Sequence, residues 1–135
     1  MAHKIKKLLK VNVRAKDMGE TRHFFEDVLG ADFKSDRGTD TIGDFVGSMV
    51  ELGDDVVDIV APTSNDVPLA KAIAKRGQGL DSLCYEVENL DDTIAHLKEH
   101  GIDTFNHSNY HGSKIAFIHP KDGTGIMIEL IEKAD

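Results

Sequence analysis

The chain has 135 residues, of which 40% are hydrophobic and 30% are charged, a composition that suits one globular domain with a buried core. Its 24 acidic residues outnumber the 16 basic ones and give a net charge of −8, which excludes nucleic acid as a general partner because phosphate contacts need a basic surface. The single cysteine excludes an internal disulfide, and no apolar run reaches the roughly 18 residues that cross a bilayer. With no signal peptide, we expect a cytoplasmic protein with no membrane partner.

The first half of the chain predicts one strand, one helix and three further strands. Apolar and polar residues alternate over 8–15, which is typical of a strand with one buried face. Asp17 offers an N-cap with Glu20 three residues later, and Gly30 would end the helix. A short strand, a loop and the two strands of a hairpin then follow, at 31–36, 37–44, 45–52 and 55–61.

The second half predicts the same order of elements again. A helical connection over 68–76 begins with a proline and is closed by Gly77. A strand over 80–87 is followed by a helix that Asn89 would cap and Gly101 would end. Three further strands are predicted at 102–106, 113–119 and 125–132.

The two halves therefore form an internal repeat. A shift of 72 residues places Asp17 on Asn89, and after one deletion a shift of 71 places Gly30 on Gly101. We predict an α+β fold in which two tandem β-α-β-β-β units form a cup-shaped mixed sheet. The expected single domain covers 1–135, with units of about 5–62 and 78–133 and a helical linker of about 66–77.

Four polar residues interrupt the apolar strands at matching positions of the two halves. Lys10 falls on Ser82 with the shift of 72, and Asp58 falls on Glu129 with the shift of 71. Equivalent positions of a duplicated unit converge, so we expect all four residues in one cavity. Two carboxylates there would repel each other unless a cation lay between them, and the ammonium of Lys10 could be that cation.

Stretches spread over nearly the whole chain resemble the vicinal oxygen chelate superfamily, which contains glyoxalase I, and within it the branch similar to methylmalonyl-CoA epimerase. These stretches are 13–18, 23–30, 68–80, 85–87, 114–121 and 125–130. The resemblance implies a divalent metal held by two His, one Gln or Glu, and one Glu. Such a metal would polarise a carbonyl and stabilise the enolate that is left when an α-proton is removed.

Only part of that metal site carries over to this chain. The glutamate of the last strand is Glu129, and the Gln or Glu of the fourth strand falls on Asp58. The two histidines fall on Lys10 and Ser82, and a protonated lysine cannot ligate a cation while serine is a poor ligand. We therefore expect no metal at the family site, although a divalent ion held by the two carboxylates stays an alternative. A glutamate thought to be the base of the epimerases falls on Ile42.

Four residues are candidates for substrate binding: Asn12, Ser82, Cys84 and His111. Asn12 shares the strand face of Lys10, and the alternation of the second strand points Cys84 toward the same cavity. His111 lies in a predicted loop over 106–112, which could close as a lid and bring an acid or base. An ordinary surface loop is the alternative.

Two other sets of residues have plain structural interpretations. We expect Arg14 to reach solvent at the end of its strand, or to pair with Glu86. His96 and His100 have a helical spacing that can bind a metal, but the polar helix around them favours a solvated face.

The preferred function is an enzyme that removes a proton next to a carbonyl, as an isomerase, epimerase or lyase, with Lys10, Asp58 and Glu129 as its catalytic residues. Either carboxylate could be the base. The expected substrate is small and carbonyl-bearing, with a coenzyme A thioester as one candidate, and we expect a homodimer. The alternatives are a metal-free binding protein of the same fold and a catalytically degenerate homologue. A binding box needs apolar and aromatic walls, and the absence of Trp with only 6% aromatic residues favours the enzyme without deciding the question.

Overall fold

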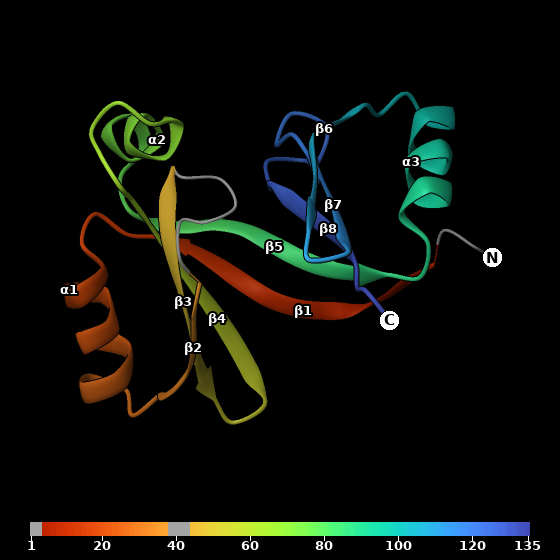
Figure 1. Ribbon diagram of the computed structural model, residues 1–135. Helices are drawn as coiled ribbons and strands as arrows, with labels where there is room; N and C mark the ends of the chain where they lie inside the picture. The colour runs from red at the N-terminus through yellow and green to blue at the C-terminus, as the bar shows by residue number, and fades with distance from the viewer. Residues whose placement is uncertain (1–3, 38–43) are drawn as a thin grey trace. The chain divides into compact units, whose positions relative to one another are not determined.

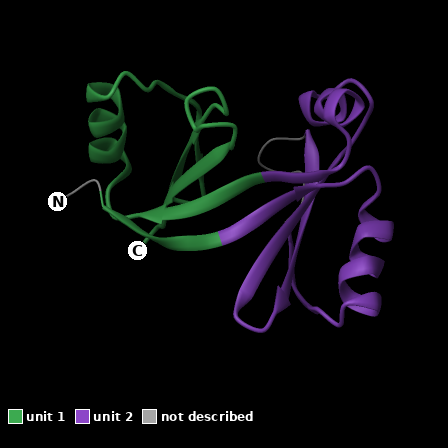
Figure 2. Cartoon of the chain, turned by 180° about the vertical axis from the view of Figure 1, so that it is seen from behind, with its two compact units in different colours: residues 1–9, 82–135 green, residues 10–81 purple. Residues whose placement is uncertain are grey.

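The computed structural model describes residues 4–37 and 44–135. Within these residues the elements follow the order β1-α1-η1-β2-β3-β4-α2-β5-α3-β6-β7-β8 (Figure 1). The chain divides into two compact units, unit 1 with Met1–Leu9 and Ser82–Asp135, and unit 2 with Lys10–Asp81 (Figure 2). The mixed α+β fold with a repeated β-α-β-β-β order, predicted from the sequence, is confirmed. Positions 38–43 of the predicted loop, including Ile42, lie outside the described residues.

Unit 2 contains most of the first repeat and the helix that follows it. Strand β1 (Ile5–Arg14) enters this unit at Lys10 and leads to α1 (Met18–His23), which continues directly into the π-helical turn η1 (Phe24–Val28). The remaining elements are β2 (Asp32–Arg37), β3 (Phe45–Leu52), β4 (Asp55–Pro62) and α2 (Pro68–Arg76). The strand order is β2-β3-β4-β1, with β1 and β4 parallel.

Unit 1 repeats this arrangement with the second half of the chain. Its elements are β5 (Gly79–Val87), which begins in unit 2, then α3 (Leu90–Glu99), β6 (Thr104–Tyr110), β7 (Ser113–Ile118) and β8 (Ile128–Glu132). The strand order is β5-β8-β7-β6, and β5 and β8 are parallel like β1 and β4. Both repeats therefore place their first and last strands side by side.

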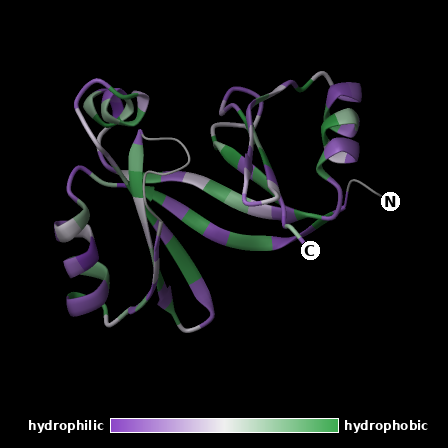
Figure 3. Cartoon of the chain, viewed as in Figure 1, coloured by the Kyte–Doolittle hydropathy of each residue, from purple (hydrophilic) through white to green (hydrophobic). Residues whose placement is uncertain are grey.

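Each unit buries the apolar face of its strands under its own helix. The core of unit 2 is formed by Ala15, Ala31, Val50 and Ile59, with Met18 and Phe25 packed against it. The core of unit 1 is formed by Val87, Leu90, Ala116, Ile118 and Leu130, with Ile94 and Leu97 packed against it. Hydrophobic and hydrophilic residues alternate along the second half of β1, from Leu9 to Arg14 (Figure 3), because successive side chains of a strand point to opposite faces. The polar strand residues consequently lie on the faces that the helices leave uncovered.

The two repeats also begin their helices in the same way. Asp17 and Asn89 each accept a hydrogen bond from the backbone N–H three residues later, at 2.9 and 3.0 Å. These side chains satisfy amide groups that the first helical turn leaves without an internal partner. The helices differ at their other ends, because the predicted helix of the first repeat becomes π-helical at η1, where the Leu29 N–H donates to the Phe24 carbonyl at 3.0 Å.

The strand predicted over 102–106 is present but was predicted too short, and the predicted loop over 106–112 is wrong. Strand β6 runs to Tyr110, passes a bulge between Phe105 and Ser108, and turns into β7 through His111 and Gly112. The bulge accommodates polar residues that break strict alternation, which is why the sequence favoured a loop there. No helix of the described residues is long and apolar enough to cross a membrane.

Strand β8 begins at Ile128 rather than at the predicted residue 125. The preceding residues form turns in which the Gly123 N–H donates to the His119 carbonyl at 3.0 Å. A Cβ at Gly123 would overlap the carbonyl oxygen of Ile126, so this turn requires glycine. The turn predicted at 121–123 is therefore present, but it extends further and delays the strand.

Candidate active site

The candidate site in unit 2 is built on the parallel pair β1 and β4. Asn12 lies beside Asp58 in this pair, and Val13 lies beside Ile59. The side chains of Val57 and Ile59 pack in the core under α1, so Asp58 between them points to the opposite face. Asp58 is 0% exposed there, and Asn12 beside it is 6% exposed.

Lys10 forms an ion pair with Asp58 on this face. Its Nζ donates to Asp58 Oδ2 at 2.5 Å, and the two side chains are 11% and 1% exposed. Removing two charges from water costs several kcal/mol for each, and close pairing offsets much of that cost. The structure thus brings together two of the three predicted catalytic residues. The predicted contact of Lys10 with Glu129 joins residues of different units and stays a prediction.

Met49 is a neighbour of Asp58 that the sequence analysis missed. It lies opposite Asp58 in the antiparallel pair of β3 and β4, and directly opposed residues share one face of a sheet. Met49 is half-buried. The signal was available, because the two-residue turn predicted between 45–52 and 55–61 implies the register that places Met49 opposite Asp58.

Arg14 holds the segment that leads from α2 into β5. Its Nε donates to the Gly77 carbonyl at 2.7 Å, and its Nη1 donates to the Leu80 carbonyl at 2.5 Å. The side chain is 12% exposed, so the expectation that it reaches solvent is wrong. Glu86 lies 3.4 Å from Lys6 Nζ, while its expected pairing with Arg14 joins residues of different units and stays a prediction. The sequence could not reveal these two contacts of Arg14, since both acceptors are backbone carbonyls.

The equivalent position of unit 1 carries Glu129. Cys84 lies beside it in the parallel pair β5 and β8, in the same register that places Asn12 beside Asp58. The residues on either side of Glu129 pack in the core under α3, so its side chain lies on the uncovered face. Cys84, Ser82 and Glu129 are all buried, at 0%, 4% and 7% exposure.

His111 lies in the tight turn between β6 and β7 and is exposed. Its φ of 51° is in the left-handed region, and its ring is 4.5 Å from that of Tyr110. His107 lies on β6, where its Nε2 is 2.7 Å from Thr104 Oγ1. A strand paired along β7 cannot swing as a lid, so the lid hypothesis for 106–112 is wrong. The role of His111 in substrate binding stays a prediction.

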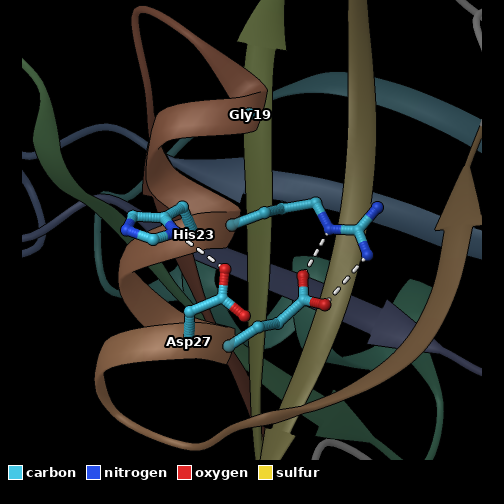
Figure 4. A pocket seen from close by; sticks show the side chains of 5 residues that line it. Gly19, His23 and Asp27 are labelled. Atoms are coloured by element: carbon cyan, nitrogen blue, oxygen red, sulfur yellow. Dashed lines mark hydrogen bonds and ion pairs between the residues drawn. The ribbon is translucent and has the colours of Figure 1, made fainter.

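A surface depression lies along α1 and η1, lined by Gly19, Arg22, His23, Glu26 and Asp27 (Figure 4). Arg22 Nε is 2.5 Å from Glu26 Oε2, and His23 Nδ1 is 2.7 Å from Asp27 Oδ2. The hydrogen bond to Glu26 raises the pKa of the Arg22 guanidinium above its usual value. Both pairs join residues four apart on one helical segment, which is ordinary for an exposed helix surface. None of the predicted site residues lines this depression.

The residues present do not fit the metal site that the family resemblance implies. Lys10 is itself a cation, and its Nζ donates a hydrogen bond to Asp58 Oδ2 at 2.5 Å. Ser82 offers only a neutral hydroxyl, which is a poor metal ligand. Asp81, the carboxylate that directly precedes Ser82, lies 3.5 Å from the guanidinium of Arg14. Over residues 4–37 and 44–135, no group of three or more His, Cys, Asp or Glu side chains could hold a metal.

A comparison with protein families identifies the framework that carries these residues. The Glyoxalase/Bleomycin resistance protein/Dioxygenase superfamily matches residues 10–117. The chain belongs to this superfamily. Among its relatives, the mitochondrial methylmalonyl-CoA epimerase of Bos taurus is 30% identical over 129 residues, which cover 89% of this chain and 70% of the epimerase.

Solved structures of this superfamily share the fold. The methylmalonyl-CoA epimerase from Mycobacterium tuberculosis has a TM-score of 0.85 and 26% identity, covering 97% of this chain and 90% of its own. A Streptomyces coelicolor methylmalonyl-CoA epimerase in complex with 2-nitronate-propionyl-CoA also has a TM-score of 0.85, at 21% identity, covering 97% of this chain and 96% of its own. The fold is therefore that of the vicinal oxygen chelate proteins, and the relatives support an epimerase-type enzyme.

Proposed function

We propose that this chain is an epimerase-type isomerase that removes and returns the proton next to the carbonyl of a small coenzyme A thioester. The observation that carries this proposal is the buried pair of Lys10 and Asp58, 2.5 Å apart, at strand positions where the family resemblance implies metal ligands. An α-proton of a thioester is weakly acidic, so its removal needs a base and a positive group for the developing oxyanion.

Asp58, or its repeat equivalent Glu129, accepts the proton in this proposal. The C–H bond breaks, the carboxylate takes the proton, and the electron pair moves to the thioester oxygen to give an enolate. Return of the proton to the other face of the carbon gives the epimer. The candidate substrate-binding residues are Asn12, Ser82, Cys84 and His111.

The relatives narrow the substrate to be tried first. Several relatives and solved structures of the same fold are named methylmalonyl-CoA epimerases, so methylmalonyl-CoA is the substrate to test before other thioesters. The homodimer and the cytoplasmic location predicted from the sequence stay predictions.

The proposal is tested by following the α-hydrogen of methylmalonyl-CoA in deuterated water. The unmodified protein should exchange it for deuterium and equilibrate the two epimers, as measured by NMR and mass spectrometry. Asp58→Asn or Glu129→Gln should slow the exchange about 100-fold or more if the carboxylate concerned is the base. The matched control is Asp27→Asn. The Asp27 side chain is 70% exposed, and it pairs with His23 on the surface of α1 and η1.

The same experiment separates the alternatives. Binding of the thioester by calorimetry without any exchange would identify a metal-free binding protein and overturn the proposed enzyme. Failure both to bind and to exchange a panel of small coenzyme A thioesters would leave a catalytically degenerate homologue.

A further inference from the structure

The ammonium of Lys10 is held in a defined place. Lys10 and Asn12 are two residues apart on β1 and share the face on which Asp58 lies. The carboxylate fixes the Nζ at 2.5 Å, and the Lys10 side chain is only 11% exposed. A cation that is fixed and largely removed from water exerts a stronger field than a solvated one, because solvent screening is weaker. These are the properties required of a group that stabilises a developing negative charge.

The same geometry opposes a metal ion. A divalent ion next to Asp58 would lie close to the ammonium of Lys10, and two cations repel each other strongly where water is excluded. Lysine has donors only and no lone pair to offer while it is protonated. The ion pair itself has no net charge, so the carboxylate does not require a divalent ion for neutralisation.

We infer that Lys10 replaces the metal of the superfamily, and that this chain stabilises its enolate with a fixed ammonium and works without a metal. This inference rests on the proposed function and deepens it. The ammonium carries a full charge and three N–H donors, so it can donate to Asp58 and to a substrate oxygen together. No redox change or co-reactant is involved, because the proton leaves carbon for a carboxylate and the electron pair moves to the thioester oxygen.

The first test removes metal from the unmodified protein. After dialysis against a chelator, with residual metal measured by elemental analysis, the deuterium exchange of methylmalonyl-CoA should keep its rate. Added zinc, cobalt or nickel should not increase it. Loss of exchange on chelation, with recovery on adding one equivalent of metal, would overturn the inference and leave the proposed function standing.

The second test removes the charge of Lys10 and measures binding, so that it does not depend on turnover. The probe is 2-nitronate-propionyl-CoA, whose nitronate resembles the enolate. Lys10→Gln can still donate a hydrogen bond to Asp58 but has no charge, and its dissociation constant for the probe should rise about 100-fold, with a similar loss of exchange rate. Lys10→Met gives a second readout, and circular dichroism checks that each variant is folded.

The matched control is Lys34→Met, which removes an exposed lysine that lies 3.5 Å from Glu51 in the same unit. It should leave both the dissociation constant and the exchange rate unchanged. A dissociation constant of folded Lys10→Gln within about threefold of that of the unmodified protein would overturn the inference. If the unmodified protein neither exchanges the proton nor binds the nitronate, the proposed function fails and the inference fails with it.

Discussion

Units 2 and 1 present the same framework with a different residue at one strand position near the buried carboxylate. Each has a parallel pair of first and last strands, and each directs an acidic residue, Asp58 or Glu129, away from the helix-covered core. In unit 2 the ammonium of Lys10 lies 2.5 Å from that carboxylate. In unit 1 the residue at the position equivalent to Lys10 is Ser82. The repeat thus determines where a carboxylate is buried, while the residue at one equivalent position of the neighbouring strand differs between the units, Lys10 in one and Ser82 in the other.

The largest expected difference between the units comes from the residues at these two equivalent positions. Lys10→Met should lower the free energy of unfolding by about 4 kcal/mol, because Asp58 stays buried without the ammonium that now pairs with it. Ser82→Ala should cost about 1 kcal/mol, since it removes only a neutral hydroxyl. Urea denaturation followed by circular dichroism measures both. Equal losses would show that the charge of Lys10 is not the source of the difference.

A double variant sharpens this prediction. Lys10→Met combined with Asp58→Leu removes both charges and should recover most of the stability that Lys10→Met loses, because apolar replacements of a buried ion pair are often neutral. The corresponding denaturation midpoint should lie closer to that of the unmodified protein than to that of Lys10→Met.

Truncation of a core residue should lower the free energy of unfolding by a similar amount in the two units, unlike the substitutions of Lys10 and Ser82. Ile59 and Leu130 are repeat equivalents, and each is fully buried, at 0% and 1% exposure. Ile59→Ala and Leu130→Ala should each cost about 3 kcal/mol, from lost burial and from the cavity that remains. Thermal or urea unfolding gives the two values. Losses that differ by more than about 2 kcal/mol would contradict the similarity of the two cores.

Removal of either helix N-cap should lower the free energy of unfolding by a smaller amount, which should be similar in the two units. Asp17→Ala and Asn89→Ala each remove a side chain that accepts a backbone hydrogen bond, at 2.9 and 3.0 Å. Each should lower stability by about 1 kcal/mol. Asp17→Asn keeps the acceptor and is the control, so a large loss for that variant would point to the charge rather than the cap.

The smallest effect is expected for a lysine of the same strand as Lys10. Lys6 lies 3.4 Å from Glu86, and its side chain is 51% exposed. Lys6→Met should change the unfolding free energy by about 0.5 kcal/mol or less, because solvent screens such a pair. A loss comparable with that of Lys10→Met would mean that burial does not govern the strength of these pairs.

Local patterns in the sequence were enough for most elements and for the caps. Alternation over 8–15 predicted β1, and Asp17 and Asn89 marked the helix starts that the structure contains. Strand β6 was predicted too short, because its bulge interrupts the alternation on which the prediction depends. Arg14 was misjudged for a different reason, since backbone carbonyls of a distant segment leave no mark on composition or spacing.

The sequence by itself determined the repeat, the fold class and the polar positions within apolar strands, since these depend on periodicity and on residue type. Only the tertiary structure decided which residues touch. The contact between Lys10 and Asp58 joins residues 48 positions apart, and it forms because the hairpin of β3 and β4 returns the chain to lie parallel to β1. Strand pairing sets that neighbourhood through long-range hydrogen bonds, and such bonds are not encoded in any short stretch of sequence.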